Sequence, residues 1–260
     1  MARTGTAEEL ASLIRERGPA IVLTGAGMST ESGIPDFRSA RGMWAEVDPF
    51  EVASLDAFRR DPLRVWQWYG PRIHGLLAAE PNDGHRALAA LERVGHVRAV
   101  VTQNIDTLHT RAGSEAVVEV HGSIRRFVCL ACGATATLDD VLDQLRFREA
   151  PECSSCGAIL KPGVVMLGEL LPLDAFDRAE GLAGDAGVLV AVGSSLGVWP
   201  VAGLPDATVR AGGALAIVND EPTPYDDVAT LLVRGRAGEV LGEVARILTA
   251  GASAPTSDTA

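Results

Sequence analysis

The sequence AIVLTGAGMSTESGIPDFR, residues 20–38, decides the fold. Its first four residues are apolar and predict a strand that is buried on both faces. Gly25 and Gly27 follow directly and predict a tight turn in which the backbone can approach a ligand closely. Backbone amides in such a turn, at the start of a helix, are suited to binding a phosphate group. The second half of the stretch adds hydroxyl, carboxylate and guanidinium groups that a dinucleotide-binding loop alone does not need.

Short strands alternate with helices along the rest of the chain. Thr6 and Glu9 form a capping box and predict a first helix that ends at Gly18–Pro19. We predict further strands at residues 97–101, 117–120, 188–192, 214–218 and 230–233, and helices at 62–77, 85–93 and 237–248, with loop and short helices over 39–60. This alternation predicts an α/β fold, a Rossmann-like and mostly parallel sheet with helices on both faces.

Five of the predicted strands end in polar or glycine-rich segments. These segments are residues 25–27, 103–106, 121, 193–195 and 219–221. Ligands of parallel sheets bind beyond the carboxyl ends of the strands, so we expect the five segments to line one crevice. The glycine spacing differs from G-x-G-x-x-G, because Gly33 is the next glycine after Gly27. No acidic residue clearly ends a second strand about 20 residues on, which disfavours a hydride-transferring dehydrogenase.

The four cysteines form two C-x-x-C pairs that are separated by 20 residues: Cys129 and Cys132, then Cys153 and Cys156. Two such knuckles can supply four thiolates to a tetrahedral zinc ion. All four positions would then be filled by protein, so this zinc would be structural. Buried free cysteines and a redox C-x-x-C are the alternatives. We predict a zinc ribbon.

The composition limits the possible partners. Acidic residues outnumber basic ones by 34 to 23, which gives a net charge of −11 and disfavours nucleic-acid binding. No apolar run approaches the roughly 18 residues of a membrane span, and charges stand where a signal peptide would be apolar. We expect a soluble, cytoplasmic monomer without nucleic-acid or membrane partners. Residues 251–260 are small and polar and predict a disordered tail.

His121 lies between an apolar strand and Gly122, a position suited to a general base near neutral pH. The alternative is a strand-end histidine that only bonds the backbone. The other histidines occur in helical or loop contexts, and we expect structural or solvated roles for residues 74, 85, 96 and 109.

Taken together, these motifs resemble the sirtuin family, NAD-dependent protein-lysine deacylases. The resemblance spans about residues 8–248 in the family's order. It is carried by GAGMSTESGIPDFR (25–38), TQNIDTLH (102–109), His121-Gly122, the two C-x-x-C pairs, KPGVVMLGE (161–169), GSSLGVWP (193–200) and VND (218–220) with Pro222-Thr223.

The resemblance implies a division of the chain. Residues 1–38, 85–122 and 166–250 would form a discontinuous Rossmann-like NAD-binding domain. Residues 39–84 would form a helical module and residues 123–165 a zinc-ribbon module, and together these would make a small lobe.

The resemblance also implies roles for individual residues. The side chains of Gln103 and Asn104 would bind the nicotinamide ribose, and Asp106 the carboxamide. The full set that would contact NAD is Gly25, Ala26, Gly27, Met28, Ser29, Pro35, Asp36, Phe37, Arg38, Gln103, Asn104, Ile105, Asp106, Gly193, Ser194, Ser195, Asn219, Asp220, Glu221 and Ala237. His121 and Asn104 would be the catalytic residues.

The implied reaction removes an acyl group from a protein lysine. The acyl-lysine oxygen attacks C1′ of the ribose as nicotinamide leaves, and His121 acts as general base on a ribose hydroxyl. The products are nicotinamide, free lysine and 2′-O-acyl-ADP-ribose. The substrate peptide would add as a strand between Val164–Val165 and residues 196–198, so that Val165 and Val198 contact it.

Tyr69 and Arg72 match the pair by which one sirtuin class recognises acidic acyl groups. A succinyl or malonyl carboxylate in an apolar channel needs a cation and a hydroxyl donor. The alternative is an ordinary helical aromatic with a solvated arginine three residues on, and Gly70–Pro71 predicts a kink between them. We expect desuccinylase and demalonylase activity with some deacetylation. A protein that is mainly a deacetylase, or a non-enzymatic NAD or ADP-ribose sensor, is the rival hypothesis.

Overall fold

A seven-stranded parallel sheet forms the centre of the larger lobe. The computed structural model describes residues 3–37 and 42–250, so Arg38 and the tail 251–260 lie outside the described residues. The strand order is β1 (Arg3–Thr4), β10 (Leu231–Val233), β9 (Ala214–Val218), β8 (Val188–Val192), β2 (Ala20–Thr24), β3 (Val97–Thr102) and β4 (Val117–Glu119). All neighbouring pairs are parallel. The predicted α/β sheet is confirmed, and the short edge strand β1 is an addition to it.

The chain reverses direction across this sheet between β2 and β8. From β2 it adds β3 and β4 on one side, and it later returns to add β8, β9 and β10 on the other side. The loops that follow β2 and β8 therefore diverge at a topological switch point, where open parallel sheets bind their ligands. The opening motif of the sequence lies in one of these two loops.

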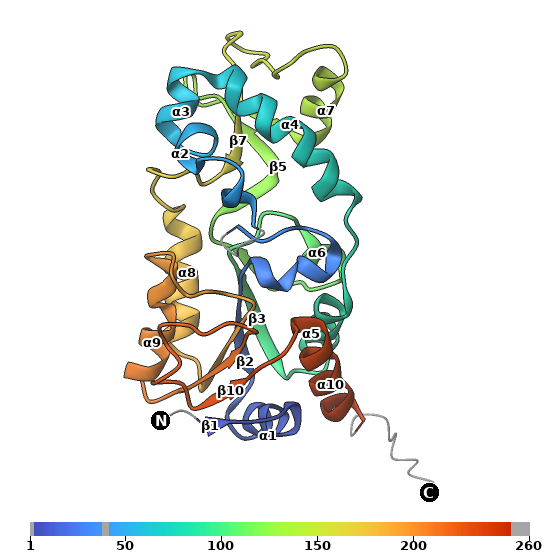
Figure 1. The fold of residues 1–260 in the computed structure, drawn as a ribbon, viewed down its shortest axis with the longest axis vertical. Helices are drawn as coiled ribbons and strands as arrows, with labels where there is room; N and C mark the ends of the chain where they lie inside the picture. Colours follow the sequence, from blue (N-terminus) through green and yellow to red (C-terminus); the bar gives the residue numbers. More distant parts are fainter. Residues whose placement is uncertain (1–2, 38–41, 251–260) are drawn as a thin grey trace, which may run out of the picture.

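Helices cover both faces of the sheet, and alternate strand residues explain why. In β2, Val22 packs on one face, while Ile21 and Leu23 pack on the other. The first face is covered by α1 (Ala7–Arg17), α5 (Asp83–Arg93) and α10 (Ala237–Thr249), and the second by α8 (Leu173–Gly184) and α9 (Leu204–Arg210). Figure 1 shows these two layers on opposite sides of the sheet, and the short α6 (Leu108–Arg111) follows β3.

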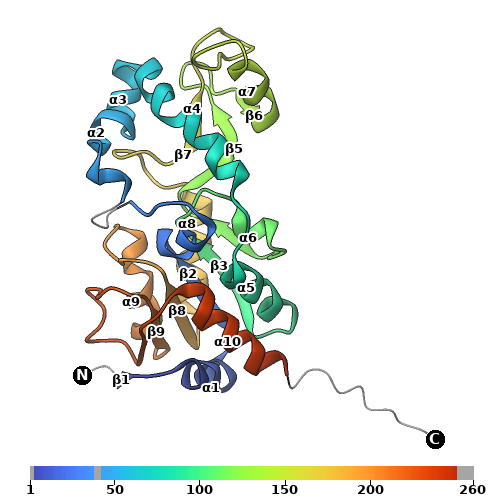
Figure 2. The same cartoon turned by 45° about the vertical axis from the view of Figure 1, so that its right-hand side comes forward.

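The smaller lobe lies above the parallel sheet in Figures 1 and 2. In the part of the chain that the structure describes, it combines a three-stranded sheet with four α-helices. The sheet has the order β6 (Thr135–Thr137), β5 (Gly122–Val128) and β7 (Lys161–Val164), and the helices are α2 (Pro49–Val52), α3 (Leu55–Arg60), α4 (Pro62–Ala78) and α7 (Leu138–Leu145). One hydrophobic core unites α3, α4 and α7 with the cysteine segment, and within it the Trp66 indole donates to the Leu160 carbonyl at 2.7 Å.

The element boundaries agree with the sequence in most places. The α1 capping box of Thr6 and Glu9 is present. The helix α5 begins at Asp83, two residues before the predicted start, because the Asn82 side chain accepts hydrogen bonds from the amides of Gly84 and His85. The helix α4 continues through Pro71 to Ala78. Among the described residues, no helix is long and apolar enough to cross a membrane.

Two of the four histidines for which we expected structural or solvated roles form a buried pair. The rings of His85 and His109 lie 4.7 Å apart between centroids, and both side chains are inaccessible to solvent. The Nε2 atom of His109 is 3.0 Å from the Thr24 hydroxyl. Burial lowers the pKa of His85 to about 4 and lowers that of His109 as well. The predicted structural role holds for this pair, whereas His74 is exposed.

We expect His85 to make the fold acid-sensitive. The unfolded chain protonates this histidine below about pH 6.5, whereas the folded protein does so only near pH 4. Stability is therefore lost as the pH falls through this window, by up to about 1.4 kcal/mol per pH unit. His85→Gln should flatten the pH dependence of the free energy of unfolding between pH 6.5 and 4, measured in urea. His74→Gln is the exposed control. An unchanged slope in His85→Gln would contradict this prediction.

Candidate functional site

The floor of the site is built by two interlocking loops. A Cβ atom on Gly25 would lie 2.8 Å from the Gly193 carbonyl oxygen, and one on Gly27 would lie 2.8 Å from the Gly193 Cα. The Gly27 amide donates to the Gly193 carbonyl at 2.8 Å, and the Gly25 amide donates to Val192 at 3.1 Å. Only glycine fits so close an approach between the ends of β2 and β8. The neighbouring loop, as well as any ligand, thus requires the two glycines.

The backbone amides of this turn are largely engaged within the protein. Besides Gly25 and Gly27, the amides of Met28 and Ser29 donate to the Gly25 and Ala26 carbonyls within the single 3-10 turn Ala26–Met28. Among the described residues this leaves the Ala26 amide, at the start of the turn, as the one without a protein acceptor. The predicted contact of this turn with a phosphate group stays a prediction, and the Ala26 amide is the donor that the protein leaves available for it.

A buried polar network contacts the turn that follows β2. The Asn104 side-chain amide donates to the Gly25 carbonyl at 3.0 Å and to the Ser29 hydroxyl at 3.1 Å. The Ser29 hydroxyl donates to an Asp106 carboxylate oxygen at 2.6 Å, and the other oxygen accepts from the Leu108 amide. Burial raises the pKa of Asp106, and these two hydrogen bonds oppose the rise. The network fixes the orientation of Asn104.

His121 lies where the two lobes meet, between β4 and β5. Its Nδ1 atom is 3.1 Å from the Gln103 carbonyl oxygen. A carbonyl can only accept a hydrogen bond, so Nδ1 carries the proton and Nε2 is the basic nitrogen of the neutral ring. The His121 carbonyl in turn accepts from the Val165 amide at 2.8 Å. The ring is bonded to the backbone, as the structural alternative expected, and it also lines the cavity.

One cavity of about 1140 Å³ brings the predicted residues together. Its lining includes Gly25, Ala26, Gly27, Ser29, Pro35, Asp36, Phe37, Tyr69, Arg72, Gln103, Asn104, Ile105, Asp106, His121, Val165, Gly193, Ser194, Ser195, Val198, Asn219, Asp220, Glu221 and Ala237. Gln103 joins the β3 and β8 loops by donating to the Ser194 hydroxyl at 3.0 Å. Met28 is placed differently: its side chain is fully buried in the core between the sheet and α10.

Trp44 and Trp68, which were not predicted from the sequence, line one end of this cavity together with the predicted Phe37. The Trp44 ring lies 5.2 Å from Phe37 and 5.6 Å from Trp68 between centroids. The Arg72 guanidinium lies 4.1 Å from the centre of the Trp68 ring and donates to the Trp68 carbonyl at 2.8 Å. Tyr69 is buried beside them, and burial raises the pKa of its hydroxyl. The only sequence signal was the aromatic cluster Trp66, Trp68 and Tyr69, which also suits a core helix.

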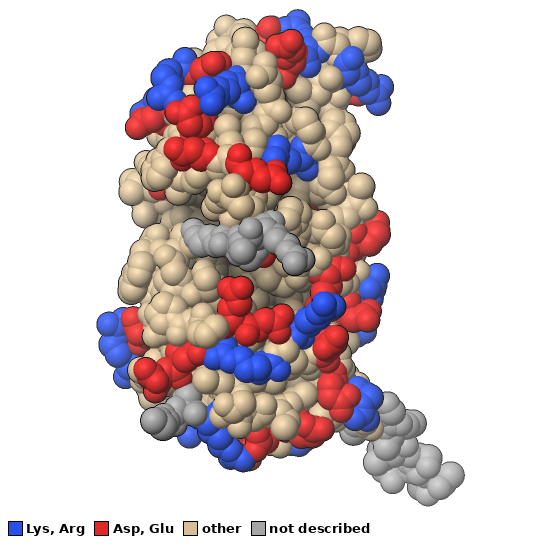
Figure 3. All heavy atoms as spheres, viewed as in Figure 1, with Lys and Arg blue, Asp and Glu red and all other residues tan. Residues whose placement is uncertain are grey.

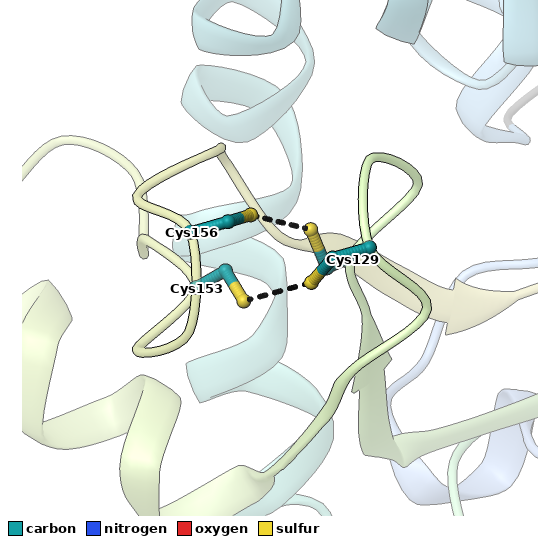
Figure 4. A group of neighbouring side chains, drawn as sticks. Cys129, Cys153 and Cys156 are labelled. Carbon is teal, nitrogen blue, oxygen red and sulfur yellow. Dashed lines mark hydrogen bonds between the residues drawn. The ribbon is translucent and has the colours of Figure 1, made fainter.

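The four cysteines lie apart from this cavity and form a compact cluster, part of which is shown in Figure 4. Their Sγ atoms all lie within 4.8 Å of one another, with Cys129 and Cys156 3.4 Å apart and Cys132 and Cys153 3.6 Å apart. Zinc–sulfur bonds of about 2.3 Å place tetrahedral thiolates about 3.8 Å apart, so this donor set fits zinc. The protein fills all four positions, which suits a structural ion.

Comparisons with known proteins agree with this geometry. The model of the Sir2 family matches residues 25–200. The chain belongs to the Sir2 family. An NAD-dependent protein deacylase of Archaeoglobus fulgidus is 41% identical over 239 residues, which are 92% of this chain and 96% of that protein. An NAD-dependent protein deacetylase of Thermotoga maritima is 43% identical over 224 residues, covering 86% and 91% of the two chains.

Solved structures of the Sir2 family share the fold. A complex of Sir2 with a p53 peptide and NAD⁺ superposes with a TM-score of 0.85 at 40% identity, covering 95% of this chain and 99% of that chain. The sirtuin resemblance of the sequence is therefore confirmed, and NAD is the cofactor of the family. The positions of the loops around the switch point suit the binding of a dinucleotide there.

We expect one zinc ion per chain, bound by the four cysteines. Cys132→Ser should lose this zinc and lower the melting temperature, because a structural zinc site contributes directly to folding. Metal analysis and thermal unfolding with and without a chelator measure both effects. Ser155→Ala, in the second knuckle, is the control and should keep the metal. A zinc-to-protein ratio far below one in the unmodified protein would remove the prediction.

Proposed function

We propose that this protein removes succinyl, malonyl and acetyl groups from protein lysines with NAD, releasing nicotinamide and 2′-O-acyl-ADP-ribose. Membership of the Sir2 family makes the chain an NAD-dependent protein deacylase. One observation supports the proposed range of acyl groups. His121 and Asn104 line the same cavity as Tyr69 and Arg72, so a catalytic end and an acyl-binding end can serve one substrate.

When bound, NAD would supply a ribose carbon that can take up the acyl oxygen of the substrate as nicotinamide is released. The chain then has to accept a proton from a ribose hydroxyl. His121 suits this task at Nε2, because the Gln103 carbonyl holds the ring with the proton on Nδ1. Asn104 is held rigidly by Gly25 and Ser29, so it can orient the ribose without a change of rotamer. No protein nucleophile is required, and zinc at the cysteines would serve only the fold.

The acyl-lysine peptide has a suitable place between the lobes. Val165 and Val198 line the cavity from opposite segments, and a peptide strand between them would bring its lysine towards His121. Backbone pairing of this kind recognises many sequences, which suits a protein that acts on various acyl-lysine proteins. The cytoplasmic location, the monomeric state and the division into domains stay predictions. On the face shown in Figure 3, acidic and basic side chains are intermixed, and the expectation that nucleic acid is not a partner also stays a prediction.

The acyl end of the cavity favours an acidic group. The Arg72 guanidinium and the buried Tyr69 hydroxyl come from one face of α4, since i and i+3 positions are neighbours on a helix. Arginine can bind a carboxylate through two parallel hydrogen bonds. Glu46 also lines the cavity, and its charge acts on Arg72. This carboxylate repels an acidic acyl group. It is therefore the feature of the cavity that favours the rival hypothesis, a protein that is mainly a deacetylase.

Removing the cation tests the acyl preference. Arg72→Met should lower kcat/KM for a succinyl-lysine peptide about 10- to 100-fold relative to the acetyl-lysine peptide, because a charge-assisted hydrogen bond is lost. Glu46→Gln should change the same ratio in the opposite direction. Arg64→Met, which alters an exposed arginine of the same helix, should leave the ratio unchanged. An unchanged ratio in Arg72→Met would make the protein mainly a deacetylase.

Removing the base separates an enzyme from a sensor. His121→Ala should lower turnover of acyl-lysine peptides by more than about 100-fold, the usual effect of losing a general base. The Kd for NAD, measured by calorimetry, should change less than twofold. His74→Ala is the exposed control. Undiminished turnover would refute the role of His121, and an absence of turnover in the unmodified protein would favour the NAD or ADP-ribose sensor.

A further inference from the structure

Lys161 is the single lysine of the chain, and every other basic side chain is an arginine. It is almost completely buried, with 3% of its surface exposed. Its ammonium group donates to the carbonyls of Pro162 at 2.8 Å and Val164 at 2.7 Å, and to the Glu169 carboxylate at 2.9 Å. An ammonium group has three N–H donors, so this charge is fully satisfied by the protein.

The Glu169 carboxylate connects Lys161 to the backbone of Met166. The oxygen that accepts from Lys161 also accepts from the Met166 amide at 2.8 Å, and the Glu169 amide donates back to the Met166 carbonyl at 3.0 Å. Leu167, which directly follows Met166, is hydrogen-bonded to the small lobe. Its amide donates to Ala53, and its carbonyl accepts from Leu55.

The ion pair thus shapes one wall of the cavity. Residues 164–169 all line it, and within this stretch the Val165 amide donates to the carbonyl of His121. A buried ion pair is seldom more stabilising than an apolar pair of equal volume. Leucine or methionine could fill the space at Lys161, but neither could bond the Val164 carbonyl. The pair is therefore better explained by the shape of the wall than by stability alone.

We propose that Lys161 and Glu169 are positioning residues for the acyl-lysine substrate. They hold residues 164–169 as a preformed edge beside His121, so that the peptide does not have to order this segment when it binds. NAD would be held by the loops of the parallel sheet, so its binding should not depend on the pair. The inference rests on the proposed placement of the peptide beside Val165, and it is independent of the preference for acidic acyl groups.

Steady-state kinetics with an acetyl-lysine peptide test this role. Lys161→Met and Glu169→Gln should each raise the KM for the peptide at least tenfold, with the KM for NAD changed less than twofold. The double variant should have a peptide KM no higher than that of the more impaired single variant, because the two residues act as one unit. Lys161→Arg keeps the charge and several donors and should recover the peptide KM to within about threefold.

A buried hydrogen bond elsewhere separates positioning from simple destabilisation. The Thr208 hydroxyl donates to the Ala183 carbonyl at 2.7 Å between α9 and α8. Thr208→Val should lower the melting temperature without changing either KM. Should Lys161→Met behave like Thr208→Val, or raise the KM for NAD as much as that for the peptide, the proposal would be overturned. Glu169→Gln keeps the shape of the side chain but removes the charge that Lys161 faces, and it provides the test if Lys161→Met does not fold.

A failure of the proposed function can be distinguished from a failure of the positioning role. An unmodified protein that does not deacylate the peptide at all would contradict that function. The positioning role is then decided by calorimetry, through the Kd of the same peptide. A tenfold weaker Kd in Glu169→Gln supports the role, and an unchanged Kd overturns it.

Discussion

The close approach of two backbone turns underlies the whole site. Because Gly25 and Gly27 carry no side chain, the turn after β2 can rest directly on Gly193 after β8. This contact sets the position of the Gly25 carbonyl, which holds Asn104, and of Ser29, which holds Asp106. A single methyl group on Gly27 would collide with the Gly193 backbone and displace both. The order of the polar network thus follows from a steric fit between two strand ends.

His121 links this floor to the smaller lobe. The residue before it closes the parallel sheet, where the Val120 amide donates to Thr102, and the residue after it opens β5 of the antiparallel sheet. Gly122 has a φ of 73°, and a Cβ there would lie 2.2 Å from the Gly163 carbonyl oxygen. The histidine is therefore fixed from both sides. Its place at the junction puts one imidazole in the wall of the cavity that residues of both lobes line.

The sequence predicted the features that depend on local patterns. Apolar runs such as Ala20–Leu23, the Thr6 cap and the paired cysteines each carry their signal within a few residues, and the structure has them as expected. Features that depend on contacts between distant segments of the chain were not predicted. Trp44 and Glu46 reach the cavity only through the fold, and the amides of the glycine turn are taken up by Gly193, which lies far along the chain. Met28 belongs to the apolar core, although it stands among cofactor residues in the sequence.

The two cations Lys161 and Arg72 use their N–H donors in different ways. All three donors of Lys161 are used within the protein, so its charge serves the wall. Arg72 has five N–H donors, and among the described residues one of them reaches an acceptor, the Trp68 carbonyl. Its stacking on Trp68 holds the guanidinium plane while other donors remain available. A cation that is already oriented loses little conformational freedom when a carboxylate binds, and this pre-orientation of Arg72 is what supports the proposed preference for acidic acyl groups.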